Sequence, residues 1–399
     1  MPGASPLATP RFAVAPGPYS VTLEPFGAVP RARSYVARVC GPTQSTCRVT
    51  TRVTRSGFTF SGLTAGATYT VMLTAIGDGV RYANSAPGWR RTFAASSCLV
   101  VDSTRPVPVS GTLQTAALAA APGDALKIYG TCHGPTTIDK SLDIVGQSAP
   151  AFGPPTLTGD HLGLVITVDA GSVRLTNLTV TGGRAPTETV SDGHGGTAGS
   201  GGAINNYGTL SLIDARVTGN SSYDAGAAGI ENFGFLELFG TTAVSGNSGY
   251  IGGAIANDGG TVTLDDSSSV SGNAAPVGGG IDNISGTVTL NDSSSVTDNT
   301  AGGRCGGGGG VMNAGSLTLN DSSTISGNSA DCAPGGGVFN ASGTVTLNGS
   351  SSITDNRAGP VLTAVGGGIY NDHGTLVNCV PGSGGNVSGN VPDDITVVP

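Results

Sequence analysis

The sequence predicts an all-β protein in which an N-terminal β-sandwich is followed by a right-handed parallel β-helix with three strands per coil. The main observation is internal repetition. In the second half of the chain, an apolar residue followed two positions later by asparagine recurs every 25 to 31 residues. Between these positions, apolar and polar residues alternate in short runs, as in strands that bury one face. The first hundred residues alternate similarly without the repeat, which is typical of an antiparallel sandwich.

Composition limits the classes of function. The chain has 67 glycines and only 11% charged residues, but 38% are hydrophobic, and their regular spacing indicates a packed core rather than disorder. A net charge of −8 without any basic run argues against nucleic acid as a partner. No run of 18 apolar residues is present to form a transmembrane segment, and the start, MPGASPLATP, lacks the features of a signal peptide. We therefore expect any leader to be missing from this chain.

The N-terminal part divides into two expected segments. Residues 1–10, rich in Pro and Ala, are expected to be disordered, and residues 11–95 to form the sandwich. Within the sandwich, residues 62–79, GLTAGATYTVMLTAIGDG, resemble the corner between strands E and F of a fibronectin type III domain, with Tyr69 as its tyrosine corner. The early-strand tryptophan of that family is absent, because Trp89 lies late in the segment. The resemblance implies a spacer or a binding module.

Residues 96–123 are expected to lead into the β-helix and to cap it. A strand comes first, and the apolar run TLQTAALAAA then predicts a short helix that ends at Pro-Gly-Asp. The first coil of a β-helix would otherwise expose its core and its unpaired strand edges at the open end. A helix laid across that end solves both problems.

The β-helix is predicted over residues 124–399. The repeated apolar residue stands at Ile204, Ile230, Ile255, Ile281, Val311, Val338 and Ile369. The asparagine two positions later stands at Asn206, Asn232, Asn257, Asn283, Asn313, Asn340 and Asn371. A second asparagine series closes the third strand of each coil, at Asn220, Asn247, Asn273, Asn299, Asn328, Asn356 and Asn390. Because asparagine tolerates sharp corners and its amides can bond from coil to coil, we predict that both series are structural.

The repeat also carries a resemblance. The motif GGAI at residues 201–204 and 252–255, with the third strand ending in Gly-Asn, resembles the repeats of polymorphic outer-membrane proteins and related bacterial surface β-helix proteins. The resemblance covers about 220 residues and implies the fold more than an activity. Members of that class are often adhesins, and because these 399 residues show no C-terminal membrane barrel, we expect the chain to depart from them in how it is anchored.

The seven cysteines favour an oxidising, extracellular compartment. We predict disulfides between Cys40 and Cys47, between Cys98 and Cys132, and between Cys305 and Cys332, each of which precedes its coil's apolar residue by six positions. This leaves Cys379 single, with a role that the sequence does not reveal.

One row of residues is the candidate site. The position between the repeated apolar residue and its asparagine is expected to point outward. Up the stack this position holds Asn205, Glu231, Ala256, Asp282, Met312, Phe339 and Tyr370. Acidic at one end and aromatic at the other, this row fits a groove that binds a sugar or protein ligand, and it also fits a solvated face whose residues share no function. If the protein is an enzyme, Glu231 and Asp282 are the candidate carboxylates, roughly 9.6 Å apart over two coils, and Arg216 is the nearby base.

Other candidates favour structural interpretations. Asp192 and His194, in SDGHGG, resemble the Gly-His-Gly motif of polygalacturonases, but the sequence has no lysine after residue 140 to complete such a site. His133, His161 and His373 do not have the spacing of metal ligands. The corner residues Asp265, Asp266, Asp292 and Asp321 are expected to cap turns rather than bind calcium. We expect no metal and no cofactor.

Two rows of hydroxyls are expected on the outer face of the second strand. They are formed by Thr261 and Thr263, Thr287 and Thr289, Ser316 and Thr318, and Thr344 and Thr346. Such a lattice resembles the faces of ice-binding β-solenoids, and it also follows from the use of Thr as a soluble β-branched residue.

These observations predict a secreted or cell-surface binding scaffold for a glycan or a protein, without enzymatic activity. The alternative is an extracellular polysaccharide hydrolase or lyase that uses the row around Glu231 and Asp282, and ice binding is a minor alternative. The identity of the ligand, the anchoring and the oligomeric state stay open.

Overall fold

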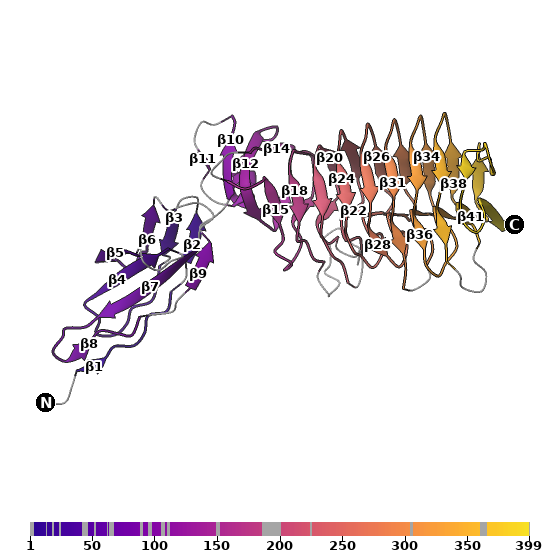
Figure 1. Ribbon diagram of the computed structural model, residues 1–399. Coiled ribbons are helices and arrows are strands. Elements are labelled where there is room, and N and C mark those ends of the chain that lie inside the picture. The colour runs from indigo at the N-terminus through magenta and orange to yellow at the C-terminus, as the bar shows by residue number, and fades with distance from the viewer. Residues whose placement is uncertain are drawn as a thin grey trace.

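The computed structural model describes most of the chain. The described residues are 4–12, 14–17, 20–23, 25–41, 47–51, 53–61, 63, 68–87, 91–94, 98–104, 108–109, 112–148, 152–185, 201–223, 226–303, 306–359 and 365–398. Figure 1 shows small N-terminal sheets beyond one end of a long parallel β-solenoid, with the C-terminus at its other end. Trp89, Asp192, His194 and Cys305 lie outside the described residues.

Two small antiparallel sheets form the N-terminal part. One contains β2 (Val14–Gly17), β3 (Ser20–Leu23) and β6 (Phe58–Ser61), and the other contains β5 (Cys47–Thr51), β4 (Ser34–Cys40), β7 (Thr68–Ile76) and β9 (Arg91–Ala94). Residues from both sheets, including Leu23, Phe60 and Leu73, share one buried apolar cluster.

A short strand lies in the segment that was expected to be disordered. β1 (Ser5–Pro6) pairs in parallel with β8 (Tyr82–Ala83), and Leu7 packs into the apolar cluster while its N–H donates to the carbonyl of Ala83. The expectation of disorder is therefore wrong for Ser5 to Leu7, because one buried leucine and a strand edge are enough to order them.

The solenoid has about nine turns of right-handed type, with three parallel strands in each coil. The first strands form a ten-stranded sheet of β13 (Thr136–Ile138), β16 (Ile166–Val168), β19 (Ile204–Asn206), β22 (Ile230–Asn232), β25 (Ile255–Asn257), β29 (Ile281–Asn283), β33 (Val311–Asn313), β37 (Val338–Ala341), β41 (Ile369–Asp372) and β44 (Ile395–Val398). We call it the first-strand sheet.

The second and third strands belong to one 21-stranded sheet, which begins with β10 (Cys98–Asp102), β11 (Pro108–Val109) and β12 (Ala125–His133). The second strands are β14 (Leu142–Gly146), β17 (Ser172–Thr176), β20 (Thr209–Ile213), β23 (Phe235–Phe239), β26 (Thr261–Leu264), β30 (Thr287–Leu290), β34 (Ser316–Leu319), β38 (Thr344–Leu347) and β42 (Thr375–Val377). The third strands are β15 (Thr156–Thr158), β18 (Thr179–Thr181), β21 (Arg216–Thr218), β24 (Ala243–Ser245), β27 (Ser269–Ser271), β31 (Ser295–Thr297), β35 (Thr324–Ser326), β39 (Ser352–Thr354) and β43 (Val387–Ser388).

Four coils add a further short strand that the sequence did not predict. These strands are β28 (Ala274–Ala275), β32 (Thr300–Ala301), β36 (Ser329–Ala330) and β40 (Arg357–Ala358), and they form a small parallel sheet of their own.

The predicted registry of the coils is confirmed. Asn257 pairs with Asn283 and Val311 with Val338, and the repeated apolar residues are fully buried in one continuous core. Both asparagine series form ladders of side-chain hydrogen bonds between neighbouring coils, such as Asn257 to Asn283 at 2.9 Å and Asn273 to Asn299 at 2.9 Å. Each amide thus satisfies a buried group of the next coil.

Three of the four acidic corner residues cap turns, while the fourth, Asp265, accepts a side-chain hydrogen bond from Asn291 of the next coil at 2.7 Å. Asp266, Asp292 and Asp321 adopt left-handed backbone conformations, with φ of 57°, 54° and 56°. The side chain of each accepts an N–H from the preceding coil, as Asp266 does from Gly240 at 2.9 Å. Within the described part of the chain, no group of three or more His, Cys, Asp or Glu residues is placed to hold a metal ion.

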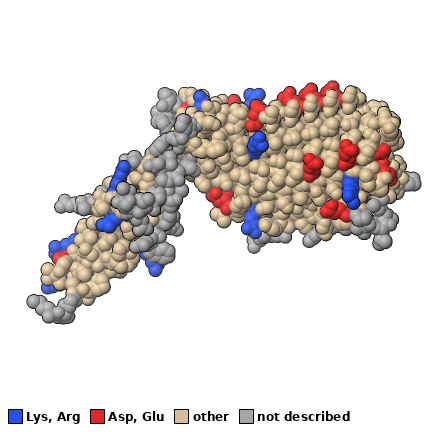
Figure 2. Space-filling view, viewed as in Figure 1, with Lys and Arg blue, Asp and Glu red and all other residues tan. Residues whose placement is uncertain are grey.

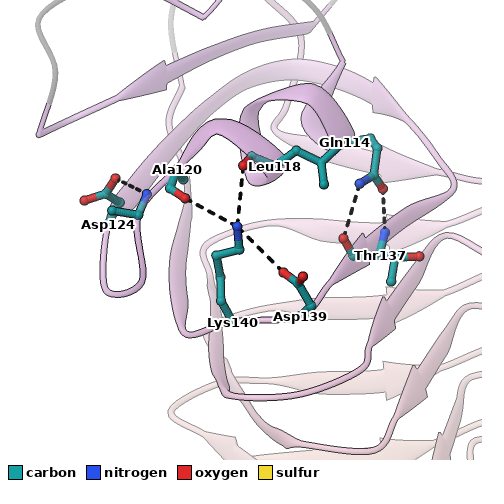
Figure 3. Close-up of polar contacts among 8 residues, drawn as sticks. Gln114, Leu118, Ala120, Asp124, Thr137, Asp139 and Lys140 are labelled. Atoms are coloured by element: carbon teal, nitrogen blue, oxygen red, sulfur yellow. Dashed lines mark hydrogen bonds and ion pairs between the residues drawn. The ribbon is translucent and has the colours of Figure 1, made fainter.

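A helix covers the first coil. Helix α1 (Leu113–Ala119) begins after Thr112, whose hydroxyl accepts the N–H of Thr115, and it buries Leu113, Ala116 and Ala117 against the core. Figure 3 shows how its polar groups reach the adjoining strand and turn. The amide of Gln114 accepts the N–H of Thr137 at 2.7 Å and donates to the carbonyl of the same residue at 3.4 Å. The side chain therefore satisfies the backbone at the edge of the first-strand sheet.

Replacing Gln114 with alanine is expected to expose this edge, because both hydrogen bonds to Thr137 are lost. The expected cost is about 1 kcal/mol for partly solvated hydrogen bonds. Hydrogen exchange should then be about fivefold faster at the Thr137 amide and unchanged at Asn257, far along the solenoid. Unchanged exchange at Thr137 would show that water replaces the glutamine without loss.

Two of the predicted disulfides are confirmed. Cys40 is bonded to Cys47, and Cys98 to Cys132, with Cα atoms 4.1 Å and 4.7 Å apart. Cys332 is also disulfide-bonded, while its predicted partner Cys305 lies outside the described residues. Cys379 is free and half-buried at the C-terminal end of the core. No helix in the described ranges is long and apolar enough to cross a membrane.

Candidate functional site

The candidate row is stacked as the repeat predicts. In the first-strand sheet, Asn205 pairs with Glu231, Ala256 follows, and Asp282, Met312, Phe339 and Tyr370 continue the row in register. The residues therefore form one continuous line across seven coils. Glu231 and Asp282 lie two coils apart, roughly 9.6 Å between backbones, with the small side chain of Ala256 between them.

The acidic half of the row is not a solvent-facing surface, contrary to the expectation that the whole row points outward. Asn205, Ala256 and both carboxylates are buried; Glu231 is 5% and Asp282 6% exposed. Glycine-rich residues directly before β19, β22, β25 and β29 lie over this half of the row. The N–H of Gly201 donates to the Asn205 side chain at 2.7 Å, and that of Ala227 donates to the Glu231 carboxylate at 2.8 Å.

Glycine is needed for this covering. A Cβ atom on Gly201 would lie 2.8 Å from the Asn205 side-chain oxygen and 3.1 Å from Cβ of Glu231. In the next coils Gly252 and Gly278 adopt left-handed conformations, with φ of 59° and 55°. The Gly-Gly pairs of the repeat thus serve to place backbone directly on the row.

Burial changes the protonation of both carboxylates. Burial raises the pKa of Glu231 to about 8, against the opposing hydrogen bond from Ala227, and the charges of Asp258 and Asp282 raise it further. Burial, followed by the charge of Asp258, raises the pKa of Asp282 to about 7. At neutral pH Glu231 is therefore mainly protonated, and Asp282 is divided between its two forms.

Arg216 does not join this site. It lies on β21, a third strand, where it pairs with Thr179 on one side and Ala243 on the other. Glu231 lies on β22 in the first-strand sheet. The structure thus brings the two carboxylates into one row but leaves the predicted base exposed on another face.

The aromatic half of the row is more accessible. Met312, Phe339 and Tyr370 are half-buried, and the rings of Phe339 and Tyr370 lie 5.1 Å apart at an interplanar angle of 39°. A tilted aromatic pair of this kind presents edge and face to a ligand.

A second aromatic group was missed by the sequence analysis. Tyr207 and Phe233 stack at 5.0 Å with an interplanar angle of 4°, and Phe235 on the following strand is 60% exposed. A signal was present, because Tyr207 and Phe233 each directly follow a residue of the first asparagine series.

The hydroxyl rows are in the predicted register. Thr261, Thr287, Ser316 and Thr344 pair in sequence along one row, and Thr263, Thr289, Thr318 and Thr346 along the other. These side chains are at least partly exposed, so the outer face of β26, β30, β34 and β38 is an uncharged hydroxyl surface.

Comparison with known proteins gives no family. No family model matches the chain, and no curated protein matches it. Among solved structures, a pectate lyase from Pectobacterium carotovorum is similar at 13% sequence identity over 98% of this chain and 100% of that one, with a TM-score of 0.17. A TM-score that low supports no inference about this chain.

Proposed function

We propose that this chain is a non-enzymatic binding scaffold that is secreted or displayed on a cell surface, where it holds a glycan or a protein. The observation that carries the proposal is the burial of Glu231 and Asp282 beneath the glycine-rich backbone. A carboxylate that attacks or protonates a polymer must reach it, and these two are covered by the chain's own backbone. What faces solvent instead is a rigid lateral surface of hydroxyls and aromatic rings.

The compartment and the N-terminal module belong to the same proposal. Two disulfides are typical of an oxidising, extracellular environment. The three-stranded and four-stranded sheets over one apolar cluster support a fibronectin type III-like sandwich, which would serve as a spacer or a second binding module. The GGAI repeats support a likeness to bacterial adhesins of the β-helix class.

A polysaccharide hydrolase or lyase is the second candidate, because the raised pKa values of Glu231 and Asp282 are what a general acid needs. An assay of reducing-end release and of unsaturated product, on a panel of polysaccharides, separates the two candidates when it is read beside glycan-array binding.

We expect the wild-type chain to bind at least one glycan or protein ligand and to release no product. The variants Glu231→Gln and Asp282→Asn should bind equally well, because their side chains do not reach the surface. Turnover by the wild type that either variant abolishes would establish the enzyme and refute the scaffold.

A further inference from the structure

The charge of the chain is sharply segregated. Residues 1–97 contain ten arginines, no lysine and two acidic residues, a formal charge of +8. Residues 98–399 contain eight basic and 24 acidic residues, a formal charge of −16. In Figure 2 the N-terminal sheets carry mostly blue side chains, and the visible face of the solenoid carries more red than blue ones. The overall charge of −8 therefore conceals a cationic module that attracts anions.

Five arginines of this module are exposed and carry no ion pair to the residues that the structure describes. They are Arg31, Arg33, Arg38, Arg55 and Arg81. The carboxylate of Asp78 is occupied by the backbone of its own turn, where it accepts three N–H groups from residues 80–82 at 2.8 to 3.0 Å. Those hydrogen bonds also lower the pKa of Asp78, and the Arg33 charge contributes least to that shift.

Two of the arginines line a cleft. The cleft has a volume of about 760 Å³ and is lined by residues 28–29, 32–35 and 53–55, with Arg33 and Arg55 among them. Two hydrogen bonds join the segments that line it: the Tyr35 hydroxyl accepts the N–H of Val29 at 2.7 Å, and the N–H of Val53 donates to the carbonyl of Tyr35 at 3.1 Å. A cleft of this size accommodates one or two sugar rings.

We propose that this cleft, with Arg33 and Arg55, binds an acidic polysaccharide through its carboxylate or sulfate groups. The inference rests on the proposed binding function and names a second ligand site for it. A planar guanidinium group binds such an anion through two parallel hydrogen bonds, and the basic residues of this module are all arginines. The aromatic ring in the cleft, Tyr35, is buried, so no exposed ring is offered there for stacking nucleic acid bases.

The test measures binding of the full-length chain to immobilised polygalacturonate, dextran sulfate, neutral dextran and single-stranded DNA by surface plasmon resonance. We expect binding to polygalacturonate or dextran sulfate, at least tenfold weaker binding when the salt rises from about 50 to about 300 mM, and none to dextran. The double variant Arg33→Gln with Arg55→Gln should weaken binding at least tenfold.

Two further double variants serve as controls. Arg174→Gln with Arg216→Gln removes two exposed arginines from the solenoid and should bind as the wild type does. Arg33→Lys with Arg55→Lys keeps the charge and should still lose affinity, because lysine cannot form the bidentate contact. Circular dichroism and the intact Cys40–Cys47 disulfide establish that the variants are folded.

The proposal fails if the cleft double variant binds as tightly as the wild type, if dextran binds as well as the charged polymers, or if DNA binds more tightly than both acidic polysaccharides. Its failure is distinct from that of the scaffold. If the chain bound only neutral glycans, the binding scaffold would be supported and the anion cleft refuted. If the chain released product from a polysaccharide and still bound anions through the cleft, the anion cleft would be supported and the non-enzymatic scaffold refuted.

Discussion

Replacing Glu231 with glutamine is expected to stabilise the folded chain by about 3 kcal/mol at pH 7 and to change nothing at pH 4. Burial raises the pKa of Glu231 from 4.5 to about 8 in the folded state. Between these two values the folded chain holds a proton that the unfolded chain has released, so the free energy of unfolding falls as pH rises. The slope is about 1.4 kcal/mol per pH unit, and the loss reaches about 3 kcal/mol by pH 7.

Glutamine removes the titration without removing the contact. Its side-chain oxygen can accept the N–H of Ala227 as the carboxylate does, at the same place in the row. Urea unfolding followed by circular dichroism from pH 4 to pH 8.5 should show a pH-dependent decline in the wild type that is shallower in the variant. Asp282→Asn should act in the same direction, because the pKa of Asp282 is raised from 3.8 to about 7.

Glu237→Gln is the matched control for the first prediction. Glu237 lies on β23 of the same coil, where it accepts a hydrogen bond from Ser211 at 2.9 Å on the outer face. The Glu237→Gln variant therefore tests whether the loss of any one negative charge stabilises this acidic solenoid, independently of burial. If Glu231→Gln were no more stable than the wild type at pH 7, Glu231 would have to be ionised and its charge compensated by a group not yet identified.

The registry of the solenoid could be predicted because the same residue types recur at matching positions in every repeat. A residue such as Asn257 has counterparts in neighbouring coils at nearly constant spacing, and parallel pairing places them side by side. The burial of Glu231 could not be predicted in this way. It depends on the path of the glycine-rich segment before each strand, whose length varies between coils and whose conformation the repeat does not specify.

Other features were present in the sequence as weaker signals. A third amide ladder runs through Asn291, Asn320 and Asn348 on the outer corner, and each of these residues directly follows the last leucine of its second strand. The charge segregation was also present, but a single net charge for the whole chain concealed it. The cleft beside Arg33 and Arg55 could not be predicted, because only the fold brings residues 28–35 together with residues 53–55.

The second large effect is expected from the buried asparagine ladder. Asn299→Ala should destabilise the solenoid by about 3 to 5 kcal/mol, because several buried groups lose their partners together. The Asn299 amide donates to the carbonyl of Val270 and to the side chain of Asn328, both at 3.0 Å, and its oxygen accepts two N–H groups of Asn273 at 2.9 and 3.0 Å. Alanine leaves those groups unpaired in a place that water does not reach.

Asn291→Ala provides the comparison within the same coil. Asn291 also bonds to the coils on both sides, to Asp265 at 2.7 Å and to Asn320 at 2.8 Å, but it is half-buried, so water can replace its bonds. We expect its loss to cost under about 1 kcal/mol. Thermal unfolding of the two variants, measured side by side, shows whether the loss of stability depends on burial of the asparagine or only on its hydrogen bonds to neighbouring coils. If they were equally stable, stacking of the strands alone would hold the coils in register, and the asparagines would be needed only for the geometry of the corners.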